Sequence, residues 1–417
     1  MSIFVPFKAI RPSADSVESV STKPYDVLDT EEAREESKGN PKSYYHVTKP
    51  EIDFPNGHDP FSPEVYKHGK QNLINLVKDG TMIQDNTESF YVYRLEMNGH
   101  VQTGLVGCCS IDDYFNEVIK KHETTKPHIE ADRKKHVCES RVNYEAVFLS
   151  YRKVDAIDEL VENLKHGKPP LYDFHSDDGV KHSLWRVEDP SIIQKITELF
   201  AAKVPTIYIA DGHHRTAAGA LAGRDLRKNA KNAKNRYGYI MSVLFPDDQV
   251  QIMDYNRAVK DLNGLSREEF LQRIRENFEV VKMEGRYRPV THQNIGLYID
   301  GSWYKLIARE GTYNPSDLVD QLSFTILSKQ ILAPILNIVD LRRDSRIEFI
   351  GGIRGLEELE KHVDSGKMAV AFAMHPISMA QIIHIADNHL SMPPKITWFE
   401  PKLRSGLFVH SLNGSFE

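Results

Sequence analysis

The feature that most constrains the fold is a junction near the middle of the chain. The apolar run 204–210 has the length and the β-branched residues of a buried strand, and it ends in an Asp-Gly-His-His-Arg motif at 211–215. The small residues that follow at 216–223 predict a helix. A strand that passes through a glycine turn into a helix leaves the first N–H groups of that helix without partners. The sequence therefore predicts an α/β unit with an anion-binding site at this junction.

The side chains of this motif suit a bound phosphate and proton chemistry. Gly212 lets the backbone approach an anion closely, and Arg215 can hold two phosphate oxygens in a bidentate fork. His213 and His214 can donate hydrogen bonds or relay protons. Asp211 ends the strand, where a carboxylate can hold Mg²⁺ or accept a proton. The simpler alternative is that Asp211 only caps the helix while the histidines pack against its first turn.

The overall charge argues against two classes of partner. The chain of 417 residues carries 53 lysines and arginines against 59 aspartates and glutamates, a formal net charge of −6. Such a balance gives no general attraction to nucleic acid or to anionic lipid. We therefore expect small-molecule partners, with neither a nucleic-acid nor a membrane partner.

Targeting signals and cysteine usage indicate the compartment. Pro6 and Lys8 interrupt the amino-terminal stretch that would be apolar in a secretory peptide, and no window approaches the roughly 20 apolar residues that span a bilayer. The three cysteines cannot form a disulfide framework and lack the paired spacing of a zinc site. These features predict a cytoplasmic protein.

The alternation of helical and strand patterns predicts an α/β or mixed α+β fold. The length suggests two or three domains at roughly 100–200 residues each. Ser266 and Glu269 form a capping box that starts a new helix, so a domain boundary is expected shortly before it. We predict one domain over 1–258, with an extended amino-terminal segment, and a second α/β domain over 259–417.

Several segments of the chain resemble a known family. The stretch IADGHHRTAAG is similar to the corresponding element of proteins with the ParB/sulfiredoxin-like fold, in particular the free-serine kinases. With PFKAIRP at the start, KHETTKP at 121–127 and MPPKITWFEPKL near the end, the chain resembles a prokaryotic family of long proteins first catalogued as a domain of unknown function. The resemblance implies a ParB/sulfiredoxin-like nucleotide-binding domain and a second α/β domain that closes the site.

The resemblance also implies an activity. The free-serine kinases are nucleotide-dependent phosphotransferases, so the implied reaction converts a small hydroxyl substrate, first of all free L-serine, to its phosphate ester. ATP or ADP would be the donor, with Mg²⁺ as cofactor. The residues that match the phosphate-binding element are Asp211, Gly212, His213, His214, Arg215 and the adjoining Thr216.

Two residues near the carboxyl terminus match a second element of the kinases. The segment at 394–397 resembles their Pro-Lys-Thr-Thr stretch, which places Lys395 and Thr397 near the nucleotide or phosphoserine. Ile396 departs from that pattern. The resemblance also suggests a contribution to substrate binding from His122 and Glu123, which an ordinary loop would explain equally well.

The kinases use an early acidic residue as general base, and Asp26 is the first choice here, with Glu32 second. A serine hydroxyl is a poor nucleophile, and a positioned carboxylate can take its proton as the phosphoryl group arrives. The alternative for Asp26 is an Asx turn after the preceding Pro-Tyr pair.

Other functions compete with this one. A regulator that binds a nucleotide or metabolite without turnover would use the same motif. A metal-dependent hydrolase built on Asp211, His213 and His214 is less favoured, because adjacent histidines rarely point at one metal without a further ligand. Sulfiredoxin chemistry would need a cysteine where this chain has His213, and a DNA-binding role would need a reading helix that the sequence does not contain.

Overall fold

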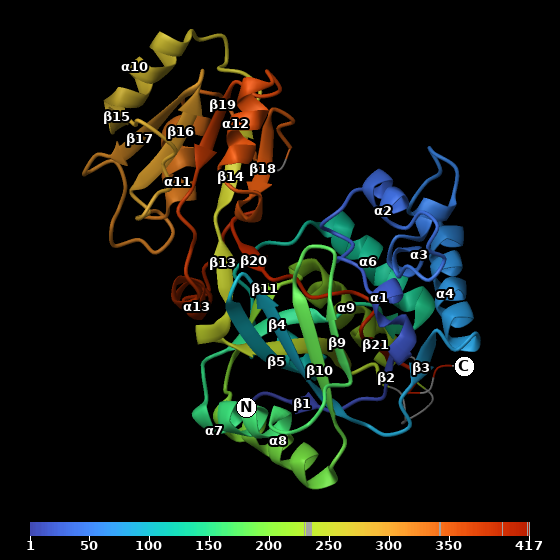
Figure 1. Cartoon of the computed structure of the whole chain (residues 1–417). Coiled ribbons are helices and arrows are strands. Elements are labelled where there is room, and N and C mark those ends of the chain that lie inside the picture. Colours follow the sequence, from blue (N-terminus) through green and yellow to red (C-terminus); the bar gives the residue numbers. More distant parts are fainter. Residues whose placement is uncertain (229, 231–235, 342, 394, 415, 417) are drawn as a thin grey trace. The chain divides into compact units, whose positions relative to one another are not determined.

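The computed structural model describes the whole chain except residues 229, 231–235, 342, 394, 415 and 417. The described residues form two compact units (Figure 1). The first unit comprises residues 1–121, 125–250 and 401–417, and the second comprises 122–124 and 251–400. Both contain helices and β-sheets, so the prediction of a mixed α/β fold is confirmed.

The last residues of the chain belong to the first unit, whereas the sequence suggested that they continue the second. The carboxyl-terminal strand β21 (Val409–Ser411) pairs antiparallel with β2 (Ala9–Pro12) and with β7 (Val142–Asn143). In Figure 1 this red strand lies beside the dark blue β2, and β3 (Met82–Gln84) completes the small sheet. Non-local strand pairing leaves no periodic signal, which is why the sequence did not reveal this return.

The main sheet of the first unit has the strand order β6-β11-β8-β12-β5-β4-β10-β9, with β1 paired to β5. It is mixed, because β12 runs parallel to β8 while β11 runs antiparallel to it. The strands are β1 (Phe4–Val5), β4 (Phe90–Met97), β5 (His100–Ser110), β6 (Ile119–Lys120), β8 (Val147–Tyr151), β9 (Tyr172–His175), β10 (Lys181–Val187), β11 (Ile207–Asp211) and β12 (Tyr239–Pro246).

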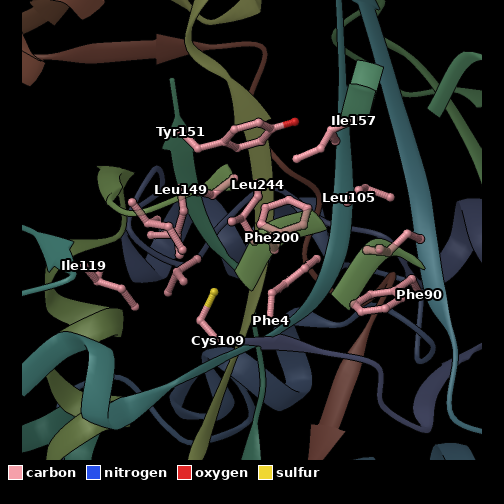
Figure 2. Packing of buried hydrophobic residues seen from close by; sticks show 14 of the residues in the cluster. Phe4, Phe90, Leu105, Cys109, Ile119, Leu149, Tyr151, Ile157, Phe200 and Leu244 are labelled. Carbon is pink, nitrogen blue, oxygen red and sulfur yellow. The ribbon is translucent and has the colours of Figure 1, made fainter. Parts of the chain in front are cut away.

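The core of this unit lies on the sheet and is closed by helices. Figure 2 shows part of it, where Phe4, Leu149 and Phe200 pack together. Apolar residues recur at helical spacing in α7 (Asp155–Lys165) and α8 (Pro190–Lys203), and their buried faces contribute to this cluster. The other helices of the unit are α1 (Val17–Val20), α2 (Thr30–Glu36), α3 (Tyr45–Thr48), α4 (Pro63–Lys78), α5 (Ile111–Phe115), α6 (Pro127–Ser140) and α9 (His213–Lys228).

The second unit is built on an antiparallel sheet with the strand order β15-β17-β16-β19-β14-β18. The predicted capping box of Ser266 and Glu269 is present and starts α10 (Arg267–Asn277). The remaining elements are β13 (Gln251–Met253), β14 (Tyr255–Val259), β15 (Phe278–Lys282), β16 (Asn294–Ile299), β17 (Ser302–Ala308), β18 (Ile347–Gly351), β19 (Val370–Ala373), β20 (Trp398–Glu400), α11 (Ser323–Leu327), α12 (Glu357–Asp364) and α13 (Met379–Asp387).

No helix among the described residues has the length and apolar character needed to cross a membrane.

Candidate functional site

The predicted strand, glycine turn and helix are present in the first unit. β11 ends at Asp211, Gly212 has a φ of +92°, and α9 begins at His213. A Cβ at position 212 would lie 3.1 Å from Nε of Arg215, so the turn needs glycine both for its backbone conformation and for the packing of this arginine. The Gly212 carbonyl accepts hydrogen bonds from the backbone N–H of Thr216 at 2.8 Å and from its hydroxyl at 3.0 Å. The Thr216 hydroxyl thus closes the turn, and its side chain is buried.

Arg215 is the centre of the site. Its side chain is only 9% exposed, and Nη1 donates to the Ala146 carbonyl at 2.9 Å. Nη2 lies 3.6 Å from Oδ2 of Asp211 and 3.9 Å from Oδ2 of Asp26. Burial disfavours the charged guanidinium, but the carboxylates of Asp26, Glu145 and Asp211 outweigh it and raise the pKa of Arg215. The arginine therefore stays charged in a largely buried position.

Asp211 is held between two cations. Nζ of Lys402 lies 3.3 Å from its Oδ2, and Arg215 approaches the same oxygen. Burial would raise the pKa of Asp211, but Lys402, then Arg215 and His213, lower it well below its ordinary value. A carboxylate this acidic is a poor proton acceptor, so the geometry favours a charge-pairing role over a general-base role.

Lys402 and Arg215 also oppose the binding of the predicted Mg²⁺ at Asp211. A divalent cation beside Asp211 would face the charges of Lys402 and Arg215, and Mg²⁺ needs carboxylate oxygens or substrate phosphates around it. The residues described around Asp211 therefore do not fit a magnesium ion.

Lys402 was not among the predicted site residues. It lies in the EPKL end of the segment quoted above, whereas the prediction selected Lys395 of the same segment. Its side chain is 15% exposed, and it reaches Asp211 from a position 191 residues away in sequence. The sequence feature that could have indicated it is a second lysine after a proline, Pro401-Lys402, in the same MPPKITWFEPKL segment.

The two candidates for the general base differ in position. The carboxylate of Asp26 is 42% exposed and close to Arg215, as given above. Glu32 instead closes a capping box at the start of α2, where it accepts from the backbone N–H of Asp29 at 2.9 Å and its own N–H donates to the Asp29 side chain at 2.8 Å. The turn around Asp26 is closed through the backbone, from Val27 N–H to the Pro24 carbonyl at 3.2 Å. The structure thus brings Asp26 to the motif and uses Glu32 as a helix cap.

Glu145 is a further acidic residue at the site that the sequence did not single out. Its carboxylate accepts from the backbone N–H of Tyr25 at 3.2 Å and from the Ser405 hydroxyl. Burial raises the pKa of Glu145, and the opposing effect of Arg215 does not overcome it because Asp26 adds a like charge. A glutamate directly before the apolar strand at 146–151 was the only sequence signal.

The two histidines of the motif lie at the start of α9. His213 is buried, 6% exposed. Nε2 of His214 accepts a hydrogen bond from the backbone N–H of Lys126 at 2.9 Å, so this ring is neutral with its proton on Nδ1. A nitrogen that accepts an N–H cannot also bind a metal, so Nε2 of His214 is not available as a ligand for the predicted hydrolase.

The other predicted site residues belong to the second unit. There Glu123 forms a parallel bridge with Met392, whose N–H donates to the His122 carbonyl at 2.8 Å. Lys395 is exposed with a φ of +69°, and its carbonyl accepts from Nη2 of Arg257 at 3.1 Å. Thr397 is half-buried, and residue 394 lies outside the described residues. The roles of His122, Glu123, Lys395 and Thr397 remain predictions.

Comparisons with known proteins place the chain in a family context. A family model described as "Protein of unknown function (DUF1015)" matches residues 4–325, as the segments quoted from the sequence led us to expect. No curated protein matches the chain.

Solved structures with a similar course of the chain are distant. A free serine kinase in complex with AMP is 15% identical, with a TM-score of 0.36 over 70% of this chain and 86% of that chain. A conserved hypothetical protein from Pyrococcus furiosus is 14% identical, with a TM-score of 0.37 over 73% and 95%. SbnI with a C-terminal truncation, from Staphylococcus aureus, is 10% identical, with a TM-score of 0.40 over 73% and 87%. Likeness at this level does not define an activity.

Proposed function

The chain belongs to the DUF1015 family of proteins of unknown function, and on this premise we propose that it is a nucleotide-dependent phosphotransferase acting on a small hydroxyl substrate. Free L-serine is the first candidate acceptor, with ATP or ADP as donor. The observation that carries the proposal is the pair of largely buried cations, Arg215 and Lys402, at the glycine turn before α9. Cations beside a helix N-terminus are suited to hold phosphate oxygens.

Each residue has a role that follows from its contacts. Arg215 and Lys402 would hold the phosphates, and Asp211 would orient both cations through its ion pairs with them. Phosphoryl transfer depends on positioning and on charge stabilisation of this kind. His214, with its proton on Nδ1, would act as a hydrogen-bond donor rather than as a base.

Asp26 would serve as the general base. Its exposed carboxylate next to Arg215 can take the proton of the acceptor hydroxyl. The hydroxyl oxygen then forms a bond to the terminal phosphorus of the nucleotide, and the bond from that phosphorus to the bridging oxygen breaks. The products are the phosphate ester and ADP from ATP, or AMP from ADP.

A regulator without turnover is the second candidate, and one observation favours it. The negative charge of Asp211 is neutralised by Lys402 and Arg215 within the protein. Asp211 can therefore have a purely structural role, which a protein without catalytic turnover would also need. Such a protein would bind a nucleotide and change its interactions without forming product.

The test is a product assay on the full chain. Purified protein is incubated with Mg²⁺, ATP or ADP, and a panel of hydroxyl amino acids, and phosphorylated products are sought by mass spectrometry. O-phosphoserine formation is expected. Nucleotide binding without product from any acceptor would favour the regulator, and the absence of nucleotide binding would remove both candidates.

Two variants test whether Asp26 is the general base and whether a loss of activity reflects misfolding. Asp26→Asn should lower turnover by about 10²–10⁴-fold, because the acceptor proton loses its carboxylate. Arg227→Ala is the matched control for changes at Arg215, because Arg227 lies on the same helix and its guanidinium pairs with the exposed Asp112 at 2.9 Å. Full activity of Asp26→Asn would move the role of base to another residue.

A further inference from the structure

A cavity of about 700 Å³ lies on the main sheet of the first unit, within the roughly 300–1,000 Å³ typical of small-molecule sites. β4 and β5 contribute Arg94 and Thr103, which are directly opposite each other. β10 contributes Trp185, which is opposite Val92, two residues from Arg94. Because side chains two residues apart on a strand share a face, these three walls stand on the same face of the sheet. The end of α7 lines the cavity as well.

This cavity is remote from the Asp-Gly-His-His-Arg motif. Four strands of the sheet separate β11, which ends in the motif, from β10, which carries Trp185. At about 4.8 Å between neighbouring strands, the two lie roughly 24 Å apart across the sheet. Among the described residues, none of 211–215 lines the cavity. A ligand bound there would therefore be separate from the substrates of the proposed phosphotransferase.

The charged walls of the cavity favour an anion. Nζ of Lys165 lies 2.6 Å from Oε1 of Glu162, and these side chains are 14% and 69% exposed. Nη2 of Arg94 lies 3.0 Å from Oε2 of Glu96, whose side chain is 40% exposed. Ion pairs with such exposed carboxylates contribute little to stability, so a ligand anion can replace them. Lysine and arginine outnumber the carboxylate on the walls by one charge, which matches a monoanion.

Trp185 gives the cavity an aromatic wall. Its indole Nε1 donates to the Lys168 carbonyl at 3.1 Å, which fixes the ring, and its side chain is only half-buried. Trp185 also lines a neighbouring cavity of about 350 Å³, where Leu164, Pro170 and Val187 provide apolar surface. An aromatic ring gains free energy by packing on indole in addition to the apolar area that it buries. The two cavities that share Trp185 thus suit a ligand with a charged end and an aromatic end.

We propose that these two cavities bind a small aromatic carboxylate, whose carboxylate pairs with Arg94 and Lys165 and whose ring packs against Trp185. Charge-assisted hydrogen bonds from arginine and lysine supply the affinity for the charged end. The inference goes beyond the proposed phosphotransferase and does not depend on it, because the residues that carry it lie away from the motif.

The test compares the binding of three probes to the full chain by calorimetry. 3-Phenylpropionate has both the ring and the carboxylate, 3-phenylpropanamide lacks the charge, and propionate lacks the ring. We expect 3-phenylpropionate to bind, and each of the other two to bind at least about tenfold more weakly, because each loses one of the two interactions.

Two variants remove the two interactions separately. Arg94→Gln should weaken the binding of 3-phenylpropionate at least about tenfold and reduce its preference over the amide. Trp185→Leu keeps apolar packing against the core but removes the indole, so the preference for 3-phenylpropionate over propionate should fall. Lys195→Gln, at an exposed position of α8, is the matched control for the loss of a cation and should bind as the wild type does. Melting curves establish that every variant is folded.

Fluorescence locates the bound ring without a change at Trp185. The chain contains three tryptophans, and Trp303 and Trp398 both belong to the second unit. In a double variant with Trp303→Phe and Trp398→Phe, the remaining indole emission comes from Trp185, and 3-phenylpropionate should change it with the affinity measured by calorimetry. Saturating ADP should leave this affinity unchanged, because the two sites are separate.

The outcomes distinguish this site from the motif. Equal binding of all three probes, no binding of 3-phenylpropionate, or unchanged binding by both variants would show that the inference is wrong. Competition between ADP and 3-phenylpropionate would place the probe at the motif and would also overturn it. If ADP fails to bind while 3-phenylpropionate binds as expected, the phosphotransferase proposal fails and the aromatic-carboxylate site stands.

Discussion

Asp211 and Glu145 share Arg215 as a charged neighbour, yet their carboxyl groups shift in opposite directions. Burial raises the pKa of both. For Asp211 the effect of burial is overcome by Lys402 and Arg215 together, so its pKa falls. For Glu145, burial and the negative charge of Asp26 raise the pKa by more than Arg215 alone lowers it, so the pKa rises. A second cation therefore decides in which direction the pKa of a half-buried carboxyl group at this site shifts.

Opposite shifts imply opposite dependence of stability on pH. A carboxylate whose pKa is lowered by folding stabilises the protein above its ordinary pKa, and this contribution is lost as the pH falls. A carboxylate whose pKa is raised by folding does the reverse, because the folded state then holds a proton that the unfolded state has released. Asp211 and Glu145 thus provide a matched pair for experiment.

The largest effect is expected from Arg215→Ala, which removes the cation common to both carboxylates. We expect a cost of about 3 kcal/mol, the lower end of the range for breaking a buried ion pair, because the side chains of Asp211 and Asp26 are still 29% and 42% exposed. Chemical denaturation at pH 7 should show this loss in the free energy of unfolding, with little change for the control Arg227→Ala. Equal stability of both variants would mean that Arg215 is solvated and not part of a charged core.

Asp211→Asn should have the next largest effect. The variant loses the ion pairs with Lys402 and Arg215, and we expect it to be about 2 kcal/mol less stable than the wild type at pH 7. The sign of the pH dependence follows from the lowered pKa: the difference should shrink as the pH falls below about 4, where the wild-type carboxylate becomes protonated in the unfolded chain. Urea unfolding between pH 3 and 7 measures it, and a difference independent of pH would contradict the assignment.

Glu145→Gln should have a smaller effect of the opposite sign. Because the pKa of Glu145 is raised, its charge is a cost at pH 7, and the variant should be as stable as the wild type or up to about 1 kcal/mol more stable. The gain should vanish near pH 4, where the wild-type residue is protonated. A loss of stability at pH 7 would show that the two carboxylates behave alike.

The smallest effect is expected from Glu32→Ala, which tests the carboxylate of the capping box at the start of α2. Loss of its half of the capping box should cost about 0.5 kcal/mol and leave turnover unchanged. The measurement combines thermal unfolding with the product assay. A drop in turnover at preserved stability would restore Glu32 as a candidate for the base.

The parts of the fold that were predictable from sequence carry local signals. The strand at 204–210, the glycine at 212 and the helix after it are adjacent in the chain, and their residue types determine their conformation without distant partners. The capping box of Ser266 and Glu269 was likewise predictable. The same kind of signal, Asp29 followed three residues later by Glu32, was available to distinguish Glu32 from Asp26.

The parts that sequence reasoning missed depend on contacts between distant residues. Lys402 reaches Asp211 from the far end of the chain, and Glu145 meets Tyr25 across 120 residues. Neither contact produces a periodic pattern. A cavity of about 50 Å³ lined by His136, Val147 and Ala218 is less predictable still, because it exists only where α6, α9 and the sheet leave a space that no single segment encodes.

The return of residues 401–417 to the first unit has a consequence for the order of events during synthesis. The ribosome synthesises the second unit, 251–400, before it makes Lys402 and β21. Domains generally fold as they emerge, but the first unit must wait for its last strand until translation has passed the whole second unit. The ion pair of Asp211 with Lys402 therefore forms late, and a nascent chain acquires its anion site only after residue 402 has been made.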